Sequence, residues 1–144
     1  MLAYFDTSAV VPLLIDEPAS ERCARAWDSA HRIASTALTY VEVHTALAQA
    51  HRRDRLSDPQ HLAAIDAFEE LWSQVTSITP SDALIRHAAA LGAAHALRGY
   101  DAVHCATAVL IMSDDSVAVS GDQDLLRAWH TAGLHTIDVS SSAH

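Results

Sequence analysis

Four acidic side chains that lie far apart in the sequence are the candidates for chemistry: Asp6, Glu42, Asp101 and Asp122. Asp6 directly follows one short apolar run, and Asp122 follows another after a single glycine. Glu42 and Asp101 lie in segments whose other residues are mostly apolar or small. Burial raises the energy of a carboxylate unless a cation neutralises it. A cluster of these four groups therefore predicts a bound metal ion.

The ligand set predicts the kind of metal and its chemistry. Carboxylate oxygens suit Mg²⁺ or Mn²⁺ rather than zinc. Cys23 and Cys105 belong to no CxxC or Cys/His spacing, so they are expected to be buried free thiols. Divalent ions held by carboxylates can stabilise the attacking and leaving oxygens of an in-line displacement at phosphorus. Phosphodiester hydrolysis by a metal-activated water is the chemistry expected.

Each acid taken alone has a simpler explanation. Asp6 and Asp101 could be helix caps, Asp122 a turn residue, and Glu42 an exposed or hydrogen-bonded helix carboxylate. Only their joint occurrence favours a metal site.

The elements that must position these acids alternate along the chain. Short apolar runs at 2–5, 31–35, 77–79, 116–120 and 135–139 predict strands. Helical spacing and capping residues predict helices over 7–14, 18–29, 36–53, 57–75, 81–97, 101–112 and 125–131. This order predicts an α/β fold with a central parallel sheet of about five short strands and helices on both faces. Ligands of such sheets bind beyond the carboxyl ends of the strands, where Asp6 and Asp122 are expected.

The composition is that of one folded domain. The chain has 144 residues, half of them hydrophobic, which predicts a single domain over 1–139 and a loose tail over 140–144. A basic leader and a long apolar segment are both missing from the sequence, so we expect a cytoplasmic protein with no membrane partner.

A formal charge of −9 argues against a nucleic-acid partner, although bulk charge is a weak criterion. All nine basic residues are arginine, and Arg52, Arg53 and Arg55 cluster in a patch suited to phosphate. The patch is equally typical of a helix end whose cations complement the helix dipole. With Arg98, these arginines are the candidate RNA contacts, and Tyr100 is a candidate for stacking on an unpaired base. The three tryptophans are expected in the core.

The sequence resembles a known family in four places: YFDTSA at 4–9, VEV at 41–43, YDAVHCATA at 100–108 and SGDQDL at 120–125. These runs are similar to the four acidic motifs of PIN domains, and the similarity spans nearly the whole chain. Among PIN domains the sequence most resembles the VapC toxins of VapBC toxin–antitoxin modules. Each motif is weak alone, but their order and spacing together are specific.

The resemblance implies an endoribonuclease that acts as the toxin of such a module. It implies that Asp6, Glu42, Asp101 and Asp122 bind Mg²⁺ or Mn²⁺, that Asp124 contributes in a second tier, and that Ser8 supports the site by hydrogen bonding. Ser120 stands where the family often has Thr, so a hydroxyl is kept. It also implies a VapB-type antitoxin that places a basic side chain among the carboxylates, and a homodimer or a higher toxin–antitoxin assembly.

His104 lies three residues after Asp101 and therefore on the same helix face. A histidine is common there in similar sequences. We expect it in the core or beside the metal ligands rather than as a ligand itself, because the surrounding face is apolar.

Three alternatives remain open from the sequence. An aspartyl-phosphate phosphotransferase also uses an Asp at the end of its first strand, but Ser8 occupies the place of the usual second Asp and the chain has no lysine. A PIN-type RNA-processing nuclease outside a toxin–antitoxin module is a second alternative. A PIN scaffold that binds RNA or protein without cutting is the third.

Overall fold

A five-stranded parallel sheet lies at the centre of the computed structural model, which describes residues 1–140. Its strands lie in the order β3-β2-β1-β4-β5. Their bounds are β1 Leu2–Phe5, β2 Arg32–Thr36, β3 Val75–Ile78, β4 Ser116–Ser120 and β5 Thr136–Asp138. The predicted parallel sheet of five short strands is therefore confirmed, with β1 between β2 and β4.

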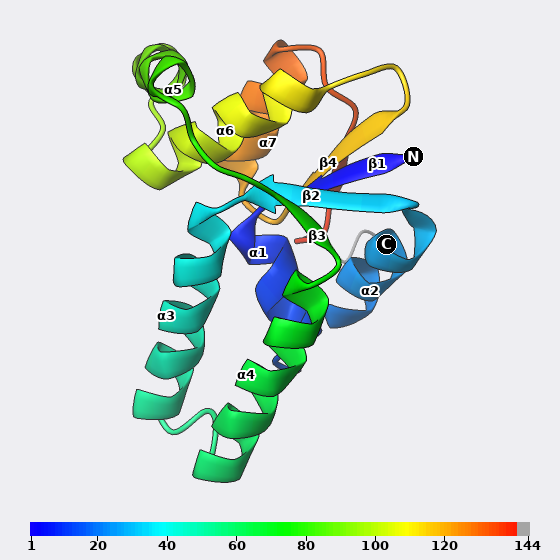
Figure 1. Cartoon of the computed structure of the whole chain (residues 1–144), viewed down its shortest axis with the longest axis vertical. Coiled ribbons are helices and arrows are strands. Elements are labelled where there is room, and N and C mark those ends of the chain that lie inside the picture. The colour runs from blue at the N-terminus through cyan, green and yellow to red at the C-terminus, as the bar shows by residue number, and fades with distance from the viewer. Residues whose placement is uncertain (141–144) are drawn as a thin grey trace.

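Helices cover both faces of the sheet, as predicted. Their bounds are α1 Thr7–Val10, α2 Ser20–Ser29, α3 Leu38–Arg52, α4 Asp58–Trp72, α5 Asp82–His95, α6 Gly99–Ile111 and α7 Gln123–Thr131, with a short 3-10 helix η1 at Val11–Leu13. In Figure 1, α5, α6 and α7 lie on one side of the sheet, and α1 to α4 lie on the other. The order β2-β1-β4 places the ends of β1 and β4 side by side, where a site between the two helical layers can form.

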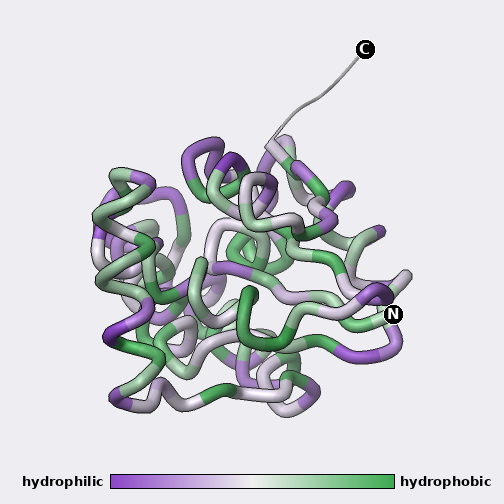
Figure 2. The backbone as a smooth tube through the Cα atoms, turned by 90° about the horizontal axis from the view of Figure 1, so that it is seen from above, coloured by the Kyte–Doolittle hydropathy of each residue, from purple (hydrophilic) through white to green (hydrophobic). Residues whose placement is uncertain are grey.

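Side chains of β1 alternate between the two layers because successive residues of a strand face opposite ways. Ala3 and Phe5 pack in the hydrophobic cluster with residues of α1, α2, α3 and α4. Tyr4 packs on the opposite face with Cys105 of α6 and Trp129 of α7. In Figure 2, hydrophobic stretches run through the middle of the molecule and hydrophilic ones are frequent in the outer turns.

The helices α3 and α4 form an arm that extends away from the sheet (Figure 1). Phe68 of α4 is fully buried between them, with its ring 5.6 Å from that of Tyr40 and 5.4 Å from that of His44, measured between centroids. Ser57 and Gln60 form a capping box that fixes the start of α4. The arm is thus an extension of the same hydrophobic core.

Several predicted helix boundaries were wrong, three of them away from the acids. The predicted helix over 7–14 is interrupted, because Pro12 has no N–H to donate and the chain continues as η1. The helix expected to include Pro18 begins at Ser20. The helix expected to reach Val75 ends at Trp72, because Val75 pairs with Ile33 in the sheet. The helices α6 and α7, which begin at Gly99 and Gln123, each start two residues earlier than predicted, next to Asp101 and Asp122.

Gly92 of α5 affects how closely that helix packs on α6, and the helices as a set bear on whether the chain could span a membrane. A Cβ atom at Gly92 would lie 3.1 Å from the Cβ of Ala102, so the glycine allows α5 to pack closely on α6. Within residues 1–140, no helix is both long enough and apolar enough to span a bilayer.

At the C-terminal end, the backbone N–H of Ser140 donates to Asp138 Oδ1 at 2.9 Å. The remaining four residues of the predicted tail, 141–144, lie outside the described part of the chain.

Candidate active site

Asp6 lies at the carboxyl end of β1 and is 3% exposed. Its Oδ1 accepts hydrogen bonds from Ser8 Oγ at 2.8 Å and from the backbone N–H of Ala9 at 3.2 Å, and its Oδ2 accepts one from Ser120 Oγ at 2.8 Å. Asp6 is therefore the cap of α1, the simpler role that the sequence analysis left open for it. Three donors fix the carboxylate while leaving lone-pair capacity for another ligand.

Two serines tie the end of β1 to the end of β4. Ser8 Oγ accepts from the backbone N–H of Gly121 at 2.8 Å, and Ser120 Oγ accepts from that of Asp122 at 2.9 Å. Because both hydroxyls also donate to Asp6, they place Asp122 next to Asp6. Asp122 in turn caps α7, since its Oδ1 accepts from the backbone N–H of Leu125 at 3.0 Å.

Glu42 reaches the same region from α3. Its Oε1 accepts from Thr7 Oγ1 at 2.7 Å and is hydrogen-bonded to His104 Nε2, also at 2.7 Å. His104 is 2% exposed, and its Nδ1 is hydrogen-bonded to Tyr4 Oη at 2.7 Å. The Tyr4 hydroxyl also accepts from the backbone N–H of Thr36 at 3.3 Å. A chain of buried hydrogen bonds therefore runs from β2 through Tyr4 and His104 to Glu42.

Asp101 lies in the first turn of α6, which begins two residues before the predicted start. Arg98 Nε donates to Asp101 Oδ2 at 3.3 Å. Burial and, next, the negative charge of Asp122 raise the pKa of Asp101, and Arg98 opposes both. The charge of Asp122 is therefore close enough to disfavour the ionised form of Asp101.

The acids differ in how well the protein stabilises their charge. Burial raises the pKa of Asp6 to about 6, against opposing attraction from His104 and hydrogen bonds from Ser8 and Ser120. Burial alone would also raise the pKa of Glu42, but the hydrogen bond and charge of His104 and the hydrogen bond of Thr7 outweigh it, so the pKa is lowered. Asp6 and Asp101 therefore carry charges that the surrounding protein does not fully compensate.

Two cavities meet at Glu42 and Tyr100. One of about 560 Å³ is lined by Glu42, Asp101, Arg98 and Tyr100 among others. The other, of about 460 Å³, extends from Thr7 and Glu42 along α3 to Arg52. The carboxylates of Glu42 and Asp101 thus open onto shared space.

Some predicted residues lie outside this group. Asp124 is exposed and pairs with Arg127. Arg53 and Arg55 are exposed beyond the sheet-distal end of α3, where Arg55 lies 3.7 Å from Glu17. Arg52 and Arg98 each line a cavity that contains Glu42.

Among residues 1–140, no three histidine, cysteine, aspartate or glutamate side chains are arranged as a ready-made metal site. Serine, threonine, histidine and backbone donors occupy carboxylate oxygens of Asp6, Glu42 and Asp122. Asp6 and Asp122 follow the ends of β1 and β4, and Glu42 and Asp101 line one cavity, but the four acids do not form a closed ligand shell.

The sequence analysis did not single out two contributors. Thr7 follows Asp6 in the first acidic motif, so its place in that motif was an available signal. Tyr4 begins the same motif, and the alternation of β1 directs it towards α6 and His104.

Comparisons with known proteins agree with this architecture. The PIN-domain family model matches residues 3–129. The chain is 36% identical to ribonuclease VapC45 of Mycobacterium tuberculosis over 132 residues, which is 92% of each chain. The structure is similar to PAE2754 from Pyrobaculum aerophilum, with a TM-score of 0.70 and 22% identity over 97% of this chain and 90% of that one. It is also similar to a chain of a toxin–antitoxin complex from Klebsiella pneumoniae, with a TM-score of 0.64 and 20% identity over 95% and 97% of the two chains. The protein described here belongs to the PIN-domain family.

Proposed function

We propose that this chain is an endoribonuclease of the VapC type that hydrolyses RNA phosphodiester bonds with a divalent metal ion. The observation that carries the proposal is the arrangement of the four acids: Ser8 and Ser120 tie Asp6 to the segment of Asp122, and Glu42 and Asp101 line one cavity. The chain shares this fold with its relatives, and the relative at 36% identity is named a ribonuclease. An enzyme of this class acts as the toxin of a type II toxin–antitoxin system.

The donor chemistry of the site fits Mg²⁺ or Mn²⁺. The candidate ligands are carboxylate oxygens, which hard divalent cations prefer. Burial raises the pKa values of Asp6 and Asp101, and the charge of Asp122 raises that of Asp101 further. A nearby cation would relieve these costs. Asp6, Glu42, Asp101 and Asp122 would hold the ion. When bound, a divalent ion of this kind lowers the pKa of a water molecule and offsets the negative charge that develops at phosphorus.

The protein side chains position the reacting groups. Ser8 and Ser120 hold Asp6 by both carboxylate oxygens, and His104 with Thr7 holds Glu42 by one oxygen. The other oxygen of Glu42 accepts no hydrogen bond from the described residues. Arg98, held at the rim by Asp101, provides a positive charge suited to a phosphate of the RNA. Because water rather than the 2′-hydroxyl is the nucleophile, the products carry 5′-phosphate and 3′-hydroxyl ends.

The proposal includes a VapB-type antitoxin partner. A site rich in carboxylates is suited to a basic side chain of an inhibitor, which would pair with the acids in place of a metal. One solved structure with the same fold is a chain of a toxin–antitoxin complex. The homodimer stays a prediction.

The test is cleavage of total cellular RNA by the purified chain, followed by mapping of the new ends. We expect cleavage with Mg²⁺ or Mn²⁺, none with EDTA, and loss of cleavage in Asp6→Asn. Asp16→Asn, an exposed acid in a loop, is the matched control and should cleave as the wild type does. Products with 2′,3′-cyclic phosphate, or equal cleavage by Asp6→Asn, would contradict the proposal.

A further inference from the structure

The cavity beside Glu42 continues as a groove along one face of α3, and its lining differs in charge from the rest of the molecule. We propose that this groove binds the unpaired RNA strand next to the cut, with Arg52 on a phosphate and Tyr100 stacked on a base. The inference rests on the proposed ribonuclease function and adds the binding path of its substrate.

The groove follows a single stripe of α3. Glu42, Thr45, Gln49 and Arg52 recur at spacings of three and four residues, so they share one helix face. With a rise of 1.5 Å per residue, Arg52 lies roughly 15 Å from Glu42 along the helix axis. A strand whose scissile phosphate lies at the acids would therefore reach Arg52 within a few nucleotides.

The lining of the groove is less acidic than the chain as a whole, so it repels an anionic polymer less. The chain has 18 acidic and nine basic residues, so most of its surface repels RNA. Among the described residues that line this cavity, Glu42 is the one carboxylate, and the lining beyond it is neutral apart from Arg52. Hydroxyl and amide groups of Thr45 and Gln49 can donate to phosphate or sugar oxygens along the way.

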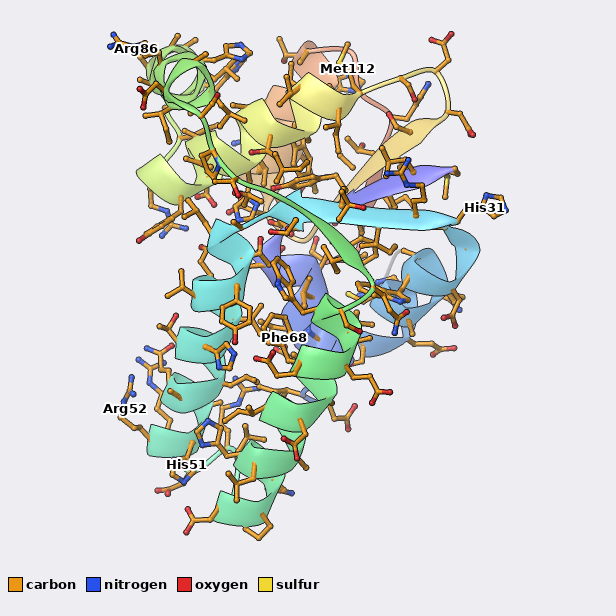
Figure 3. All side chains as sticks on the ribbon, viewed as in Figure 1. His31, His51, Arg52, Phe68, Arg86 and Met112 are labelled. Carbon is orange, nitrogen blue, oxygen red and sulfur yellow. The ribbon has the colours of Figure 1, made fainter. Side chains whose placement is uncertain are left out.

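Arg52 is available for a phosphate. It is exposed, and within residues 1–140 it makes no ion pair, whereas Arg55 pairs with Glu17. In Figure 3, Arg52 points outward from the far part of α3, well away from Arg86 on α5. An unpaired guanidinium at the end of a carboxylate-poor groove is suited to bidentate contact with phosphate.

Tyr100 supplies the aromatic surface. It is 58% exposed, belongs to α6 rather than α3, and lines both cavities that meet at Glu42. Its neighbour in the sequence is Asp101, so a base stacked on Tyr100 would lie beside the acids. Only an unpaired base presents its face to such a ring, which is why the occupant is single-stranded RNA rather than a duplex.

The test measures RNA binding separately from cleavage. The background is Asp6→Asn with Mg²⁺, and the probe is a short fluorescent mixed-sequence RNA followed by anisotropy over a range of salt concentrations. Adding Arg52→Gln should weaken binding and lower the slope of log K against log[salt] by about 0.7, the value for one phosphate contact on a single strand. Adding Arg86→Gln, the matched exposed arginine, should change neither. Adding Tyr100→Ala should weaken binding roughly tenfold, and Tyr100→Phe should restore it.

The outcomes separate the groove from the ribonuclease function. If Arg52→Gln and Arg86→Gln bind with the same affinity and salt slope, the groove assignment is wrong even when the wild type cleaves RNA. Equal binding of the matching RNA duplex, with the same dependence on Tyr100, would also overturn it. If the wild type cleaves no RNA with metal but binding still depends on Arg52 and Tyr100, the groove stands and the nuclease proposal fails.

Discussion

Glu42 illustrates how single residues set the properties of the site. Two hydrogen bonds converge on its Oε1, from Thr7 and from His104, and they lower a pKa that burial alone would raise. His104 is held in turn by Tyr4, whose pKa is raised by burial, so that its hydroxyl keeps its proton. Partners of this kind orient a metal ligand, and their loss typically costs 10–100-fold in metal affinity.

Replacing His104 tests this positioning role. His104→Leu removes the donor to Glu42, and we expect about tenfold or greater loss of Mn²⁺ affinity, measured by calorimetric titration. His104→Gln keeps an amide donor and should recover part of that affinity. Both variants leave the Tyr4 hydroxyl without its best partner, so both should lose about 1–3 kcal/mol of unfolding free energy.

Thr107→Val is the control for His104. Thr107 lies on the same helix and donates a buried hydrogen bond to the carbonyl of Val103. The substitution Thr107→Val should lower the free energy of unfolding and leave the Mn²⁺ affinity unchanged. If His104→Leu binds Mn²⁺ as Thr107→Val does, His104 is a core residue without influence on the site.

Residue types revealed the acids more readily than their partners. Asp6 and Asp122 could be found because each interrupts an apolar pattern where a strand ends. The contact between Tyr4 and His104 joins residues one hundred positions apart. Neither propensity nor periodicity reports such a pairing, because it depends on how β1 and α6 pack across the sheet.

At the scale of elements, α3 has two functions on its two faces. One face carries Glu42 and the stripe that leads to Arg52. The opposite face buries Val43 and Leu47 in the core, and Phe68 of α4 packs beside it. The direction of the proposed RNA groove therefore depends on how firmly α4 holds α3.

Phe68→Ala is expected to destabilise the arm. The side chain is fully buried and contacts the rings of Tyr40, His44 and Trp72, so its removal should cost about 3–5 kcal/mol of unfolding free energy. Urea unfolding followed by circular dichroism measures this cost. Leu62→Ala, an exposed position on the same helix, should change stability by less than about 0.5 kcal/mol. Equal effects at the two positions would show that α4 does not support α3 through Phe68.

The order and type of the elements followed from the sequence because apolar runs and helical spacing alternate clearly. The ends of elements were less predictable, since packing decides them. Val75 fits the apolar face of α4 in sequence, but pairing with Ile33 in the sheet makes it part of β3. The interruption at Pro12 could have been predicted, because a proline there cannot continue the helical hydrogen bonds.

For the whole molecule, the buried charge of Asp6 makes stability depend on pH. The pKa of Asp6 is raised from 3.8 to about 6 in the folded chain, so the folded state binds a proton more tightly than the unfolded state does. The contribution of Asp6 to the stability of the metal-free chain should therefore be fully present below pH 3.8. It should be lost as pH rises through about 6, which lowers the free energy of unfolding by roughly 3 kcal/mol at most. The raised pKa of Asp101 acts in the same direction, and the lowered pKa of Glu42 acts against it.

Asp6→Asn should flatten this dependence in urea unfolding with EDTA present, because an amide does not titrate. Asp16→Asn, which is exposed, should keep the wild-type profile. A wild-type chain that gains stability across the same pH range would mean that the folded protein compensates the charge of Asp6.

A divalent ion that relieves these buried charges should stabilise the entire fold, because it binds the native state and not the unfolded chain. At a concentration of Mn²⁺ about 100-fold above its Kd, the gain is about 2.7 kcal/mol. For a domain of this size, that gain raises Tm by roughly 5–10 °C in a calorimetric scan.

Asp101→Asn and Asp122→Asn should each reduce the rise in Tm, whereas Asp114→Asn, which changes an exposed acid before β4, should retain it. If Mn²⁺ raises Tm equally in Asp101→Asn, Asp122→Asn and Asp114→Asn, the ion binds elsewhere. If it raises Tm in none of them nor in the wild type, the four carboxylates do not hold a metal in the folded chain.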